Sequence, residues 1–417
     1  MHDAVIVGGG LAGLVAARDL AAAGRDVRLL EARDRFGGRA WAAPFGGDGP
    51  LVELGGGWFD SRLQTSLREE ADQYGVRIVR APEYRSVRWH TGGELRSGLP
   101  VPVEAGGDLE RVIVAIDEAG RGYLSGADVS VSEWLDRLEP HPATRDFVSG
   151  WVGLMSGADM DVTPISSLLG LVAEAGSAFA LLSDLAEVFA DGTNALTAAL
   201  AEDVGDVAQL ETPVTAVRQG DGVEVTTADG ETLRARVCIL AVPINTLGAI
   251  ELDPLLAQDL QDALGQGHAC RMTKVWMLAT GVPDGMLAAG WGTPLHWLAA
   301  QRSTGDAQLV VGFAVHGALD ARDRGAVERA LRAYAPGAEV RATCWHDWNA
   351  DPWARGGWVC PPVGWESAGI LERLAVPHGD VLIAGSDVAS EHPGWIAGAI
   401  ASGREQAQVA LERLGGA

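Results

Sequence analysis

The sequence predicts an α/β fold of two domains, in which a mixed α+β domain is inserted into a Rossmann-like nucleotide-binding domain. Three observations support this prediction. The 417 residues exceed what one hydrophobic core usually holds. A strand, a glycine-rich turn, a helix and a second strand follow one another within residues 4–31. A further strand and a long helix occupy residues 381–414, near the other end of the chain.

The N-terminal segment has the pattern of a βαβ unit. Ala4 to Val7 form a short apolar run that ends in glycines. Leu11 to Ala23 predict a helix, because apolar residues recur at helical spacing and Gly24 stops the pattern. Residues 27–30 are mostly apolar and mark the second strand.

Later segments return to the same domain. Asp229-Gly230 predicts a hairpin turn, and the apolar segment Val237 to Val242 follows it. The strand Val381 to Ala384 and a helix from about Trp395 to Leu414 come last. We therefore expect the nucleotide-binding domain to contain residues 1–80, 190–265 and 375–417, and the inserted substrate-binding domain to contain residues 81–189 and 266–374.

Composition argues against several classes of partner and site. The formal net charge is -24, whereas nucleic acids and anionic lipids attract basic surfaces, so we expect neither as a partner. No apolar run approaches the ~20 residues of a membrane span, and the first strand begins too early for a signal peptide to precede it. The four cysteines lack metal-type spacing, which predicts no metal site and a reduced, cytoplasmic location.

Gly8, Gly10 and Gly13 form a GxGxxG motif, with Leu11 and Ala12 between the last two glycines. The first glycine allows a tight turn, the second lets the backbone approach a pyrophosphate, and the third lets helix and strand pack closely. Free N–H groups at the helix N-terminus then face the phosphate charge. A glycine-rich turn that binds nothing is the alternative. The flanking strand and helix favour dinucleotide binding.

Glu31 closes the second strand, near the position at which an acid accepts the ribose hydroxyls, but this leaves NAD or FAD open. The segment that starts there, EARDRFGGR, resembles the extended fingerprint of the flavin-containing amine oxidase family. ELGGGW at Glu53 to Trp58, and GSD with HPGWI at residues 385–396, resemble the same family. The resemblance runs the length of the chain and, through HDW at 346–348 and GWV at 357–359, is nearest to the bacterial 6-hydroxynicotine oxidase group.

This resemblance implies an FAD-binding domain of the glutathione reductase type. In the family the GGR turn wraps the pyrophosphate, ELGGGW passes beside the flavin ring, and an acid near Asp387 holds the ribityl or pyrophosphate part. The helix N-terminus near Ile396 faces the pyrimidine edge, where it stabilises the anionic reduced flavin. Non-covalent FAD is expected, because the family's cysteine position is tryptophan here and Cys360 lies two residues later. The expected cofactor-binding residues are Gly8, Gly10, Leu11, Ala12, Gly13, Glu31, Ala32, Arg33, Gly38, Arg39, Gly55, Gly56, Gly57, Trp58, Val214, Gly385, Ser386, Asp387, Trp395 and Ile396.

Lys274 is the one lysine among 32 basic residues. A chain that prefers arginine so strongly and keeps one lysine invites a chemical explanation, because a lysine is a compact donor whose pKa shifts on burial. A surface lysine left by chance is the alternative. The surrounding segment resembles the family's lysine strand, which implies that Lys274 is catalytic and holds a water against flavin N5.

Two tryptophans are the expected substrate contacts. Trp395 stands where the family usually has a tyrosine beside the flavin, and Trp358 stands on the facing segment. Two facing rings would form a slot that orients the amine and aligns its neighbouring C–H bond. Leu154 and Ala299 replace polar residues of the 6-hydroxynicotine oxidase group, which disfavours a hydroxypyridine substrate. An amino-acid substrate is also disfavoured, because Gly57 and Trp58 stand where a carboxylate-binding arginine is found.

The resemblance therefore implies an FAD-dependent amine oxidase. It would transfer hydride from the α-carbon of an aromatic or alicyclic amine, secondary amines included, to flavin N5. The products are an imine and, with dioxygen, hydrogen peroxide. Two alternatives stay open: a flavin desaturase or dehydrogenase that acts on C–C bonds or uses another acceptor, and an FAD-binding scaffold without turnover. Whether the chain forms a homodimer is also left open.

Overall fold

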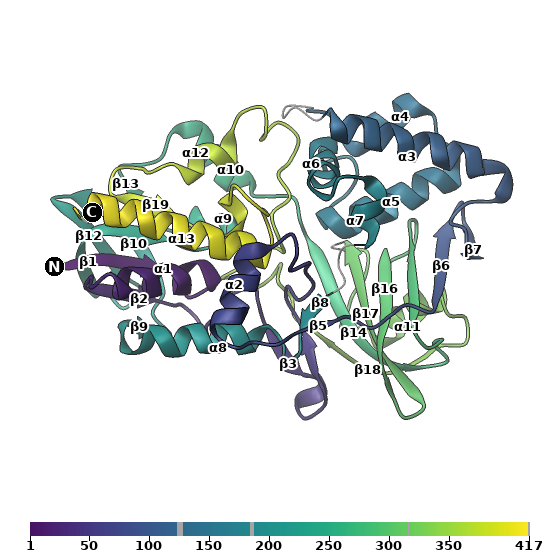
Figure 1. The fold of residues 1–417 in the computed structure, drawn as a ribbon, viewed down its shortest axis with the longest axis horizontal. Coiled ribbons are helices and arrows are strands. Elements are labelled where there is room, and N and C mark those ends of the chain that lie inside the picture. Colours follow the sequence, from purple (N-terminus) through teal and green to yellow (C-terminus); the bar gives the residue numbers. More distant parts are fainter. Residues whose placement is uncertain (123–127, 184–186, 316, 416–417) are drawn as a thin grey trace.

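The computed structural model describes residues 1–122, 128–183, 187–315 and 317–415. Two parts lie side by side, each built on its own sheet (Figure 1). Both chain termini belong to the part on the left of the view. The predicted α/β class is confirmed, since parallel strands and helices alternate at the N-terminus.

The first sheet has eight strands in the order β13-β10-β11-β12-β1-β2-β9, with β19 paired to β12. β1 runs parallel to β2 and to β12, and β12 runs parallel to β19. The predicted turn at Asp229-Gly230 joins β11 to β12, and the segment that begins at Val237 is the end of β12 itself. The strands are β1 (His2–Val7), β2 (Val27–Leu30), β9 (Ala208–Gln209), β10 (Val214–Gly220), β11 (Gly222–Thr227), β12 (Thr232–Leu240), β13 (Glu251–Asp253) and β19 (Val381–Ile383).

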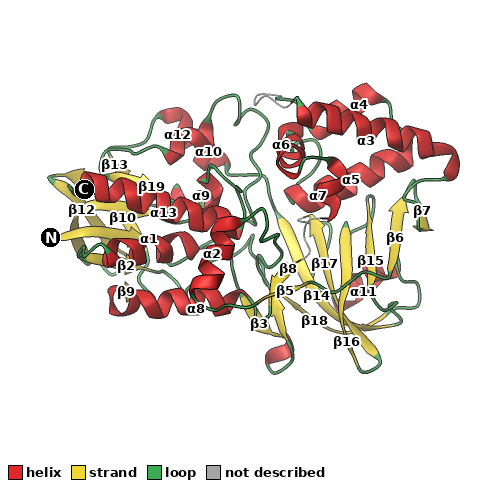
Figure 2. Cartoon of the chain, viewed as in Figure 1, coloured by secondary structure: helices red, strands yellow, loops and turns green. Residues whose placement is uncertain are grey.

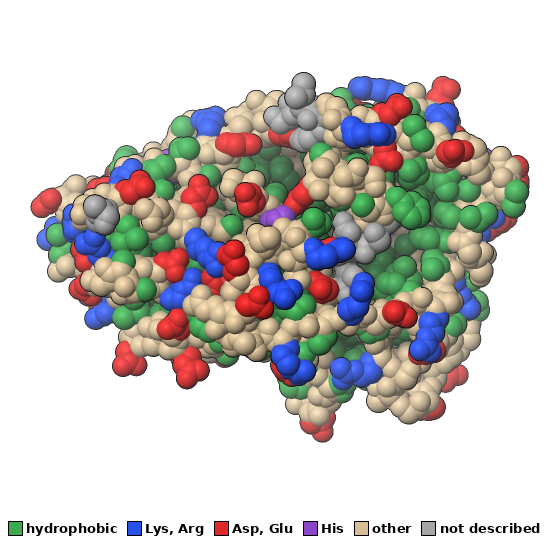
Figure 3. Space-filling view, in the orientation of Figure 1, with side chains coloured by type: hydrophobic (Ala, Val, Ile, Leu, Met, Phe, Trp, Pro, Cys, Tyr) green, Lys and Arg blue, Asp and Glu red, His purple; other side chains and the backbone are tan. Residues whose placement is uncertain are grey.

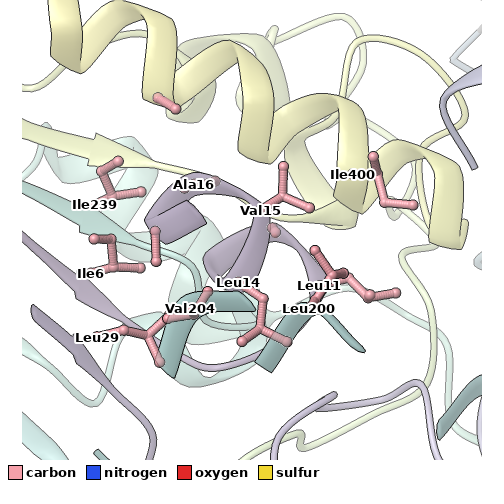
Figure 4. Close-up of a cluster of buried hydrophobic side chains, with 14 of the residues drawn as sticks. Ile6, Leu11, Leu14, Val15, Ala16, Leu29, Leu200, Val204, Ile239 and Ile400 are labelled. Carbon is pink, nitrogen blue, oxygen red and sulfur yellow. The ribbon is translucent and has the colours of Figure 1, made fainter. Parts of the chain in front are cut away.

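Helices α1 (Leu11–Ala22), α8 (Thr193–Val204) and α13 (Ile396–Arg413) form the core over one face of this sheet. Figure 4 shows side chains of α1, the sheet, α8 and α13 directed into one apolar cluster. A Cβ on Gly403 would lie 2.4 Å from the Ala12 carbonyl oxygen. Glycine is therefore required there for α13 to pack closely on α1.

The second sheet has seven strands in the order β18-β14-β17-β16-β15-β6-β7. α5 packs on β6, β15 and β16, and Figure 2 shows α3 to α7 gathered beside one end of these strands. The strands are β6 (Ser86–Thr91), β7 (Glu94–Ser97), β14 (Met272–Thr280), β15 (Met286–Gly290), β16 (Trp297–Thr304), β17 (Ala307–Val315) and β18 (Glu339–Trp345). The helices are α3 (Gly106–Arg121), α4 (Val131–Leu138), α5 (Pro142–Ser156), α6 (Ile165–Ala175), α7 (Ala178–Ser183) and α11 (Arg324–Arg332).

Two short strand pairs lie outside these sheets, and four further helices pack on the first part. β3 (Ala42–Pro44) pairs with β4 (Leu51–Glu53), and β5 (Ile78–Arg80) pairs with β8 (Glu187–Phe189). The helices not yet named are α2 (Thr65–Gln73), α9 (Ile244–Leu247), α10 (Gln258–Gln266) and α12 (Ile370–Ala375).

Packing departs from the predicted segmentation at two places. Trp365 and Ile370, assigned above to the substrate-binding segment, pack in the apolar cluster of the first sheet. Phe45 and Val52, assigned to the nucleotide-binding segment, pack with residues of the second sheet. Burial of apolar side chains, rather than chain order, decides where these linking segments lie. The segment boundaries otherwise stay a prediction, and residues 123–127, 184–186, 316 and 416–417 within them lie outside the described residues.

Acidic and basic side chains are interspersed over the face shown in Figure 3. Within the described ranges, no helix is long and apolar enough to cross a membrane. The same ranges contain no group of three or more His, Cys, Asp or Glu suited to holding a metal ion.

Candidate active site

A cavity of about 1050 Å³ runs from the glycine-rich turn of the first part to β14 and β17 of the second. Gly10 and Glu31 line one end, while Lys274, Phe313 and Trp358 line the other. Small-molecule pockets commonly measure roughly 300–1,000 Å³, so this volume suits a large cofactor together with a small substrate.

Each of the three motif glycines is required for a different structural reason. Gly8 adopts φ +105°, a left-handed conformation that favours glycine. A Cβ on Gly13 would lie 1.9 Å from the Gly8 carbonyl oxygen, so α1 packs against the turn only because Gly13 lacks a side chain. A Cβ on Gly10 would meet no protein atom within 4 Å and would enter the cavity. Gly10 thus leaves open space where a phosphate could approach the backbone.

The start of α1 is suited to an anion. Gly10 is its N-cap residue and provides no side-chain hydrogen bond to the helix. The first N–H groups of a helix lack intrahelical partners, and they carry the positive end of the helix dipole. Because Gly10, Leu11 and Ala12 all line the cavity, these groups can bind a pyrophosphate there.

Glu31 is buried, with 5% of its surface exposed, and lies on the cavity wall beside this helix start. Its two carboxylate oxygens accept hydrogen bonds from the backbone N–H groups of Gly9 (2.6 Å) and Arg33 (2.8 Å). Burial raises the pKa of Glu31, and these two hydrogen bonds offset part of that rise. Each oxygen keeps accepting capacity, so the carboxylate can also accept hydrogen bonds from ribose hydroxyls.

Arg33 and Arg39 tie the cofactor end to distant segments. Arg33 forms a bidentate pair with Asp351, at 2.7 and 2.9 Å. Arg39 donates to the Gly357 carbonyl oxygen at 2.6 Å and to Asp387 at 2.7 Å. Both arginines line the cavity.

Asp387 lies behind the cavity wall. It is 2% exposed, pairs with Arg39, and accepts a hydrogen bond from the Ile244 N–H at 3.1 Å. Burial would raise the pKa of Asp387, but Arg39 and His268 beside it lower the pKa below its usual range. The structure therefore places Asp387 where it orients Arg39, and its expected contact with the cofactor stays a prediction.

A second helix start meets the other end of the cavity. Trp395 is the N-cap residue of α13 and makes no side-chain capping bond, so the first N–H groups of this 18-residue helix lack that partner. Trp395 and Ile396 both line the cavity. A Cβ on Gly56 would lie 3.8 Å from Ile396, so the glycine segment and the helix start form one wall. This wall can stabilise negative charge on a bound ring.

Lys274 projects from β14 into this region and is buried, with 5% of its surface exposed. Its Nζ donates to the Gly55 carbonyl oxygen at 2.7 Å and lies 4.4 Å from the centroid of the Trp58 ring. Burial lowers the pKa of Lys274 from 10.5 to about 7, although the nearby Glu53 carboxylate opposes this. The amine therefore exchanges its proton near neutral pH.

Glu53 is held in place by Thr193. The Thr193 N–H and hydroxyl each donate to a Glu53 carboxylate oxygen at 2.8 Å. Burial raises the pKa of Glu53, while Lys274 and Thr193 lower it again. Glu53 is thus the charge partner of Lys274, a role that the sequence analysis did not assign to it.

The rest of this end is aromatic and apolar. Trp358 donates its indole N–H to the Met155 carbonyl oxygen at 2.6 Å, which fixes the ring. Leu154 also lines the cavity. Ala299 is fully buried and belongs to the apolar cluster behind the wall, so only one of the two predicted substitutions faces the cavity.

The structure brings nearly all the predicted site residues to this one cavity. Every predicted cofactor-binding and catalytic residue lines it except Gly13, which packs the turn, and Asp387, which holds Arg39. Sequence reasoning missed Glu53 as a charge partner and did not find Glu174 and His392, which also line the wall. No local motif marks Glu174, and the HPGWI segment that contains His392 does not indicate this contact, because α6 and the loop before α13 meet only in the fold.

Comparison with known proteins agrees with the geometry. The model of the family described as flavin containing amine oxidoreductase matches residues 11–411. The chain is 34% identical over 421 residues to (S)-6-hydroxynicotine oxidase of Paenarthrobacter nicotinovorans, across 96% of this chain and 97% of that protein. It is 29% identical to pseudooxynicotine dehydrogenase of a Pseudomonas species, across 97% of this chain and 85% of that protein.

The fold is shared with a solved structure. A triple mutant of putrescine oxidase matches with a TM-score of 0.88 at 24% sequence identity, across 99% of both chains. At that identity the match bears on the fold alone. Family match, relatives and cavity agree with the resemblance seen in the sequence, and the chain therefore belongs to the flavin-containing amine oxidoreductase family, with FAD as its cofactor.

Proposed function

We propose that this amine oxidase acts on an aromatic or alicyclic amine, primary or secondary, with dioxygen as electron acceptor and hydrogen peroxide as a product. The observation that carries the proposal is the lining of the cavity around Lys274. Trp58, Phe313, Trp358 and Leu154 line this end, so apolar and aromatic surfaces surround a single amine group. Such a pocket favours a substrate with an apolar body.

The chain's residues fit FAD. The open space at Gly10, the start of α1 and Glu31 would hold the pyrophosphate and ribose. Gly55, Gly56 and the start of α13 would border the ring. When bound, FAD supplies the two-electron acceptor for amine oxidation and passes the electrons to dioxygen.

Lys274 would act as a proton acceptor in this pocket. An amine substrate must lose its ammonium proton before a neighbouring C–H bond can be oxidised, and the sequence offered no base for this. Because burial lowers the pKa of Lys274 to about 7, its Nζ is partly neutral at neutral pH and can accept a proton, directly or through water. Its expected second role, holding a water beside the flavin, stays a prediction.

The relatives limit the substrate class. One is an oxidase of (S)-6-hydroxynicotine and another a dehydrogenase of pseudooxynicotine. Leu154 on the wall cannot hydrogen-bond a pyridine hydroxyl, which favours an apolar ring over a hydroxylated one. Apolar contacts discriminate weakly between amines that differ by little apolar surface, so several should react.

Anaerobic mixing of the purified holoenzyme with a panel of amines tests the proposal. Loss of flavin absorbance with an aromatic or alicyclic amine, followed by recovery and peroxide formation in air, is the expected result. Loss without recovery in air would remove dioxygen as the acceptor. A flavin that no amine reduces would refute amine oxidation and favour a desaturase or a scaffold. The expected cytoplasmic location and a homodimer stay predictions.

A further inference from the structure

An ion pair joins the two parts of the molecule at the wall of the active-site cavity. Nδ1 of His392, in the loop before α13, contacts Oε1 of Glu174 in the last turn of α6. Both residues line the cavity, while 15% of the His392 side chain and 37% of the Glu174 side chain remain exposed. The pair therefore lies where the cavity opens to solvent.

The ring of His392 is surrounded by acceptors. Glu174 approaches from α6, the Leu63 backbone hydrogen-bonds the ring from the segment before α2, and the Glu391 carboxylate lies on the same loop. A hydrogen bond to Glu174 is the main cause that raises the pKa of His392, and Glu391 adds to it. An imidazolium has a donor on each ring nitrogen and so suits partners on two sides.

The loop that carries His392 also carries Trp395. His392 adopts φ +49°, a left-handed conformation that is uncommon for a residue with a side chain. Its carbonyl oxygen accepts the Trp395 N–H at 3.1 Å, and the Gly394 N–H donates to the Ser386 carbonyl oxygen at 2.8 Å. The position of His392 is thus transmitted through a tight turn to the Trp395 backbone.

We propose that His392 and Glu174 are a positioning pair for the amine substrate. The pair holds the Trp395 loop against α6 and sets the width of the cavity entrance. The proposal rests on the proposed amine oxidation. Neither residue needs to touch the reacting atoms. Loss of the pair would free the loop, so that the substrate binds more weakly while the chemical step is less affected. Because the pair needs the imidazolium, it weakens as the pH rises through the His392 pKa.

Glu174→Gln removes the charge and keeps the size of the side chain. We expect it to raise KM about tenfold, the loss typical of a charge-assisted hydrogen bond, with a smaller effect on kcat. In the wild type, KM should rise as the pH passes the His392 pKa, whereas the variant should lack this dependence. Glu174→Asp keeps the carboxylate and should keep the pH dependence. Glu110→Gln removes an exposed carboxylate of α3 that does not line the cavity and serves as the control for charge alone.

Titration of the histidine rings by NMR provides a readout that does not depend on turnover. His392→Gln identifies the signal of this residue among the nine histidines. Its midpoint should lie above the ordinary value of about 6.5 in the wild type and fall toward that value in Glu174→Gln. A wild-type midpoint at the ordinary value would overturn the proposal, as would a Glu174→Gln enzyme with wild-type KM at every pH.

Two further outcomes separate the possible failures. If no amine reduces the wild-type flavin, the proposed function fails, but the histidine titration still decides whether the pair forms. If Glu174→Gln does not fold, the wild-type titration and the Glu174→Asp profile replace it. A Glu174→Asp enzyme without pH dependence, beside a wild type that has it, would count against positioning by the charge.

Discussion

The glycine motif offers a sharp test of where the cofactor binds, because two of its glycines are required for different reasons. Gly10 has φ -72° and ψ 178°, which alanine adopts without strain, and its missing Cβ faces the cavity. Gly13 faces the protein, and its Cβ would lie 1.9 Å from the Gly8 carbonyl oxygen. Gly10→Ala should therefore impair FAD binding, whereas Gly13→Ala should impair the fold.

The two substitutions should change the stability of the cofactor-free protein in opposite directions. Replacing glycine by alanine in a compatible conformation stabilises a protein by about 0.4–1 kcal/mol, so cofactor-free Gly10→Ala should be as stable as the wild type or slightly more so. Its methyl group would keep the pyrophosphate from the α1 N-terminus. Loss of roughly 3 kcal/mol of hydrogen bonding there weakens FAD about 100-fold. Gly13→Ala should lower the free energy of unfolding by about 1–3 kcal/mol or more, because the overlap forces α1 away from the turn.

Urea unfolding of the cofactor-free protein and fluorescence titration with FAD measure the two quantities separately. Gly106→Ala is the matched control, because Gly106 likewise has a backbone conformation that alanine adopts without strain and open space at its Cβ, but lies on α3. The control should keep wild-type affinity for FAD. If Gly10→Ala binds FAD as tightly as the control does, the pyrophosphate does not lie at Gly10 and the assignment of this end of the cavity is wrong.

Four more predictions follow from the site. Lys274→Met should slow flavin reduction or reoxidation in stopped flow by about 100-fold or more. Between about pH 7 and 10.5 the unfolded wild-type chain binds a proton that folded Lys274 lacks, so the free energy of unfolding of the wild type should rise with pH. Any excess stability of Lys274→Met over the wild type should therefore shrink through that window. Burial would raise the pKa of Asp351, but hydrogen bonds from His346 and Arg33 hold that pKa far below its usual range. Asp351→Asn should therefore destabilise the protein at neutral pH, and this destabilisation should disappear in acid. Urea unfolding across pH measures the difference. Trp395→Tyr should widen the slot and raise turnover of bulkier amines in the panel. Acid precipitation should release FAD into the supernatant, since a covalent flavin would colour the pellet.

The nucleotide-binding part could be predicted from local sequence. The strand, turn and helix from Ala4 to Ala23 depend on hydrophobic periodicity and on glycines whose roles are local, and α1 ends one residue earlier than expected. β19 and α13 could likewise be predicted from local sequence. The packing of Trp365 and Phe45 could not be predicted, because it depends on which exposed sheet face lies nearest in the finished fold.

The site was predictable where a residue acts through its own motif and was missed where it acts through a partner from another segment. Gly10 and Glu31 belong to the first kind. Asp387 was assigned to the cofactor because the GSD segment resembles the family's, and that assignment stays a prediction; the structure adds its contacts with Arg39 and the Ile244 N–H, which the sequence did not indicate. The contact of His392 with Glu174 could not be predicted, because the HPGWI segment that contains His392 does not indicate a partner on α6.

The role of Lys274 could be predicted from the sequence, whereas its charge state depends on the fold. Its singularity in an arginine-rich chain indicated a chemical role, but the charge state that this role requires is set by surroundings from three separate segments. The Trp58 ring and the strand around the lysine exclude water, while Glu53, held by Thr193, restores part of the stability of the cation. An arginine in this place would stay charged at any working pH. A single lysine in an aromatic wall thus gives this enzyme a group that can gain or lose a proton near neutral pH, next to the surface where an amine would bind.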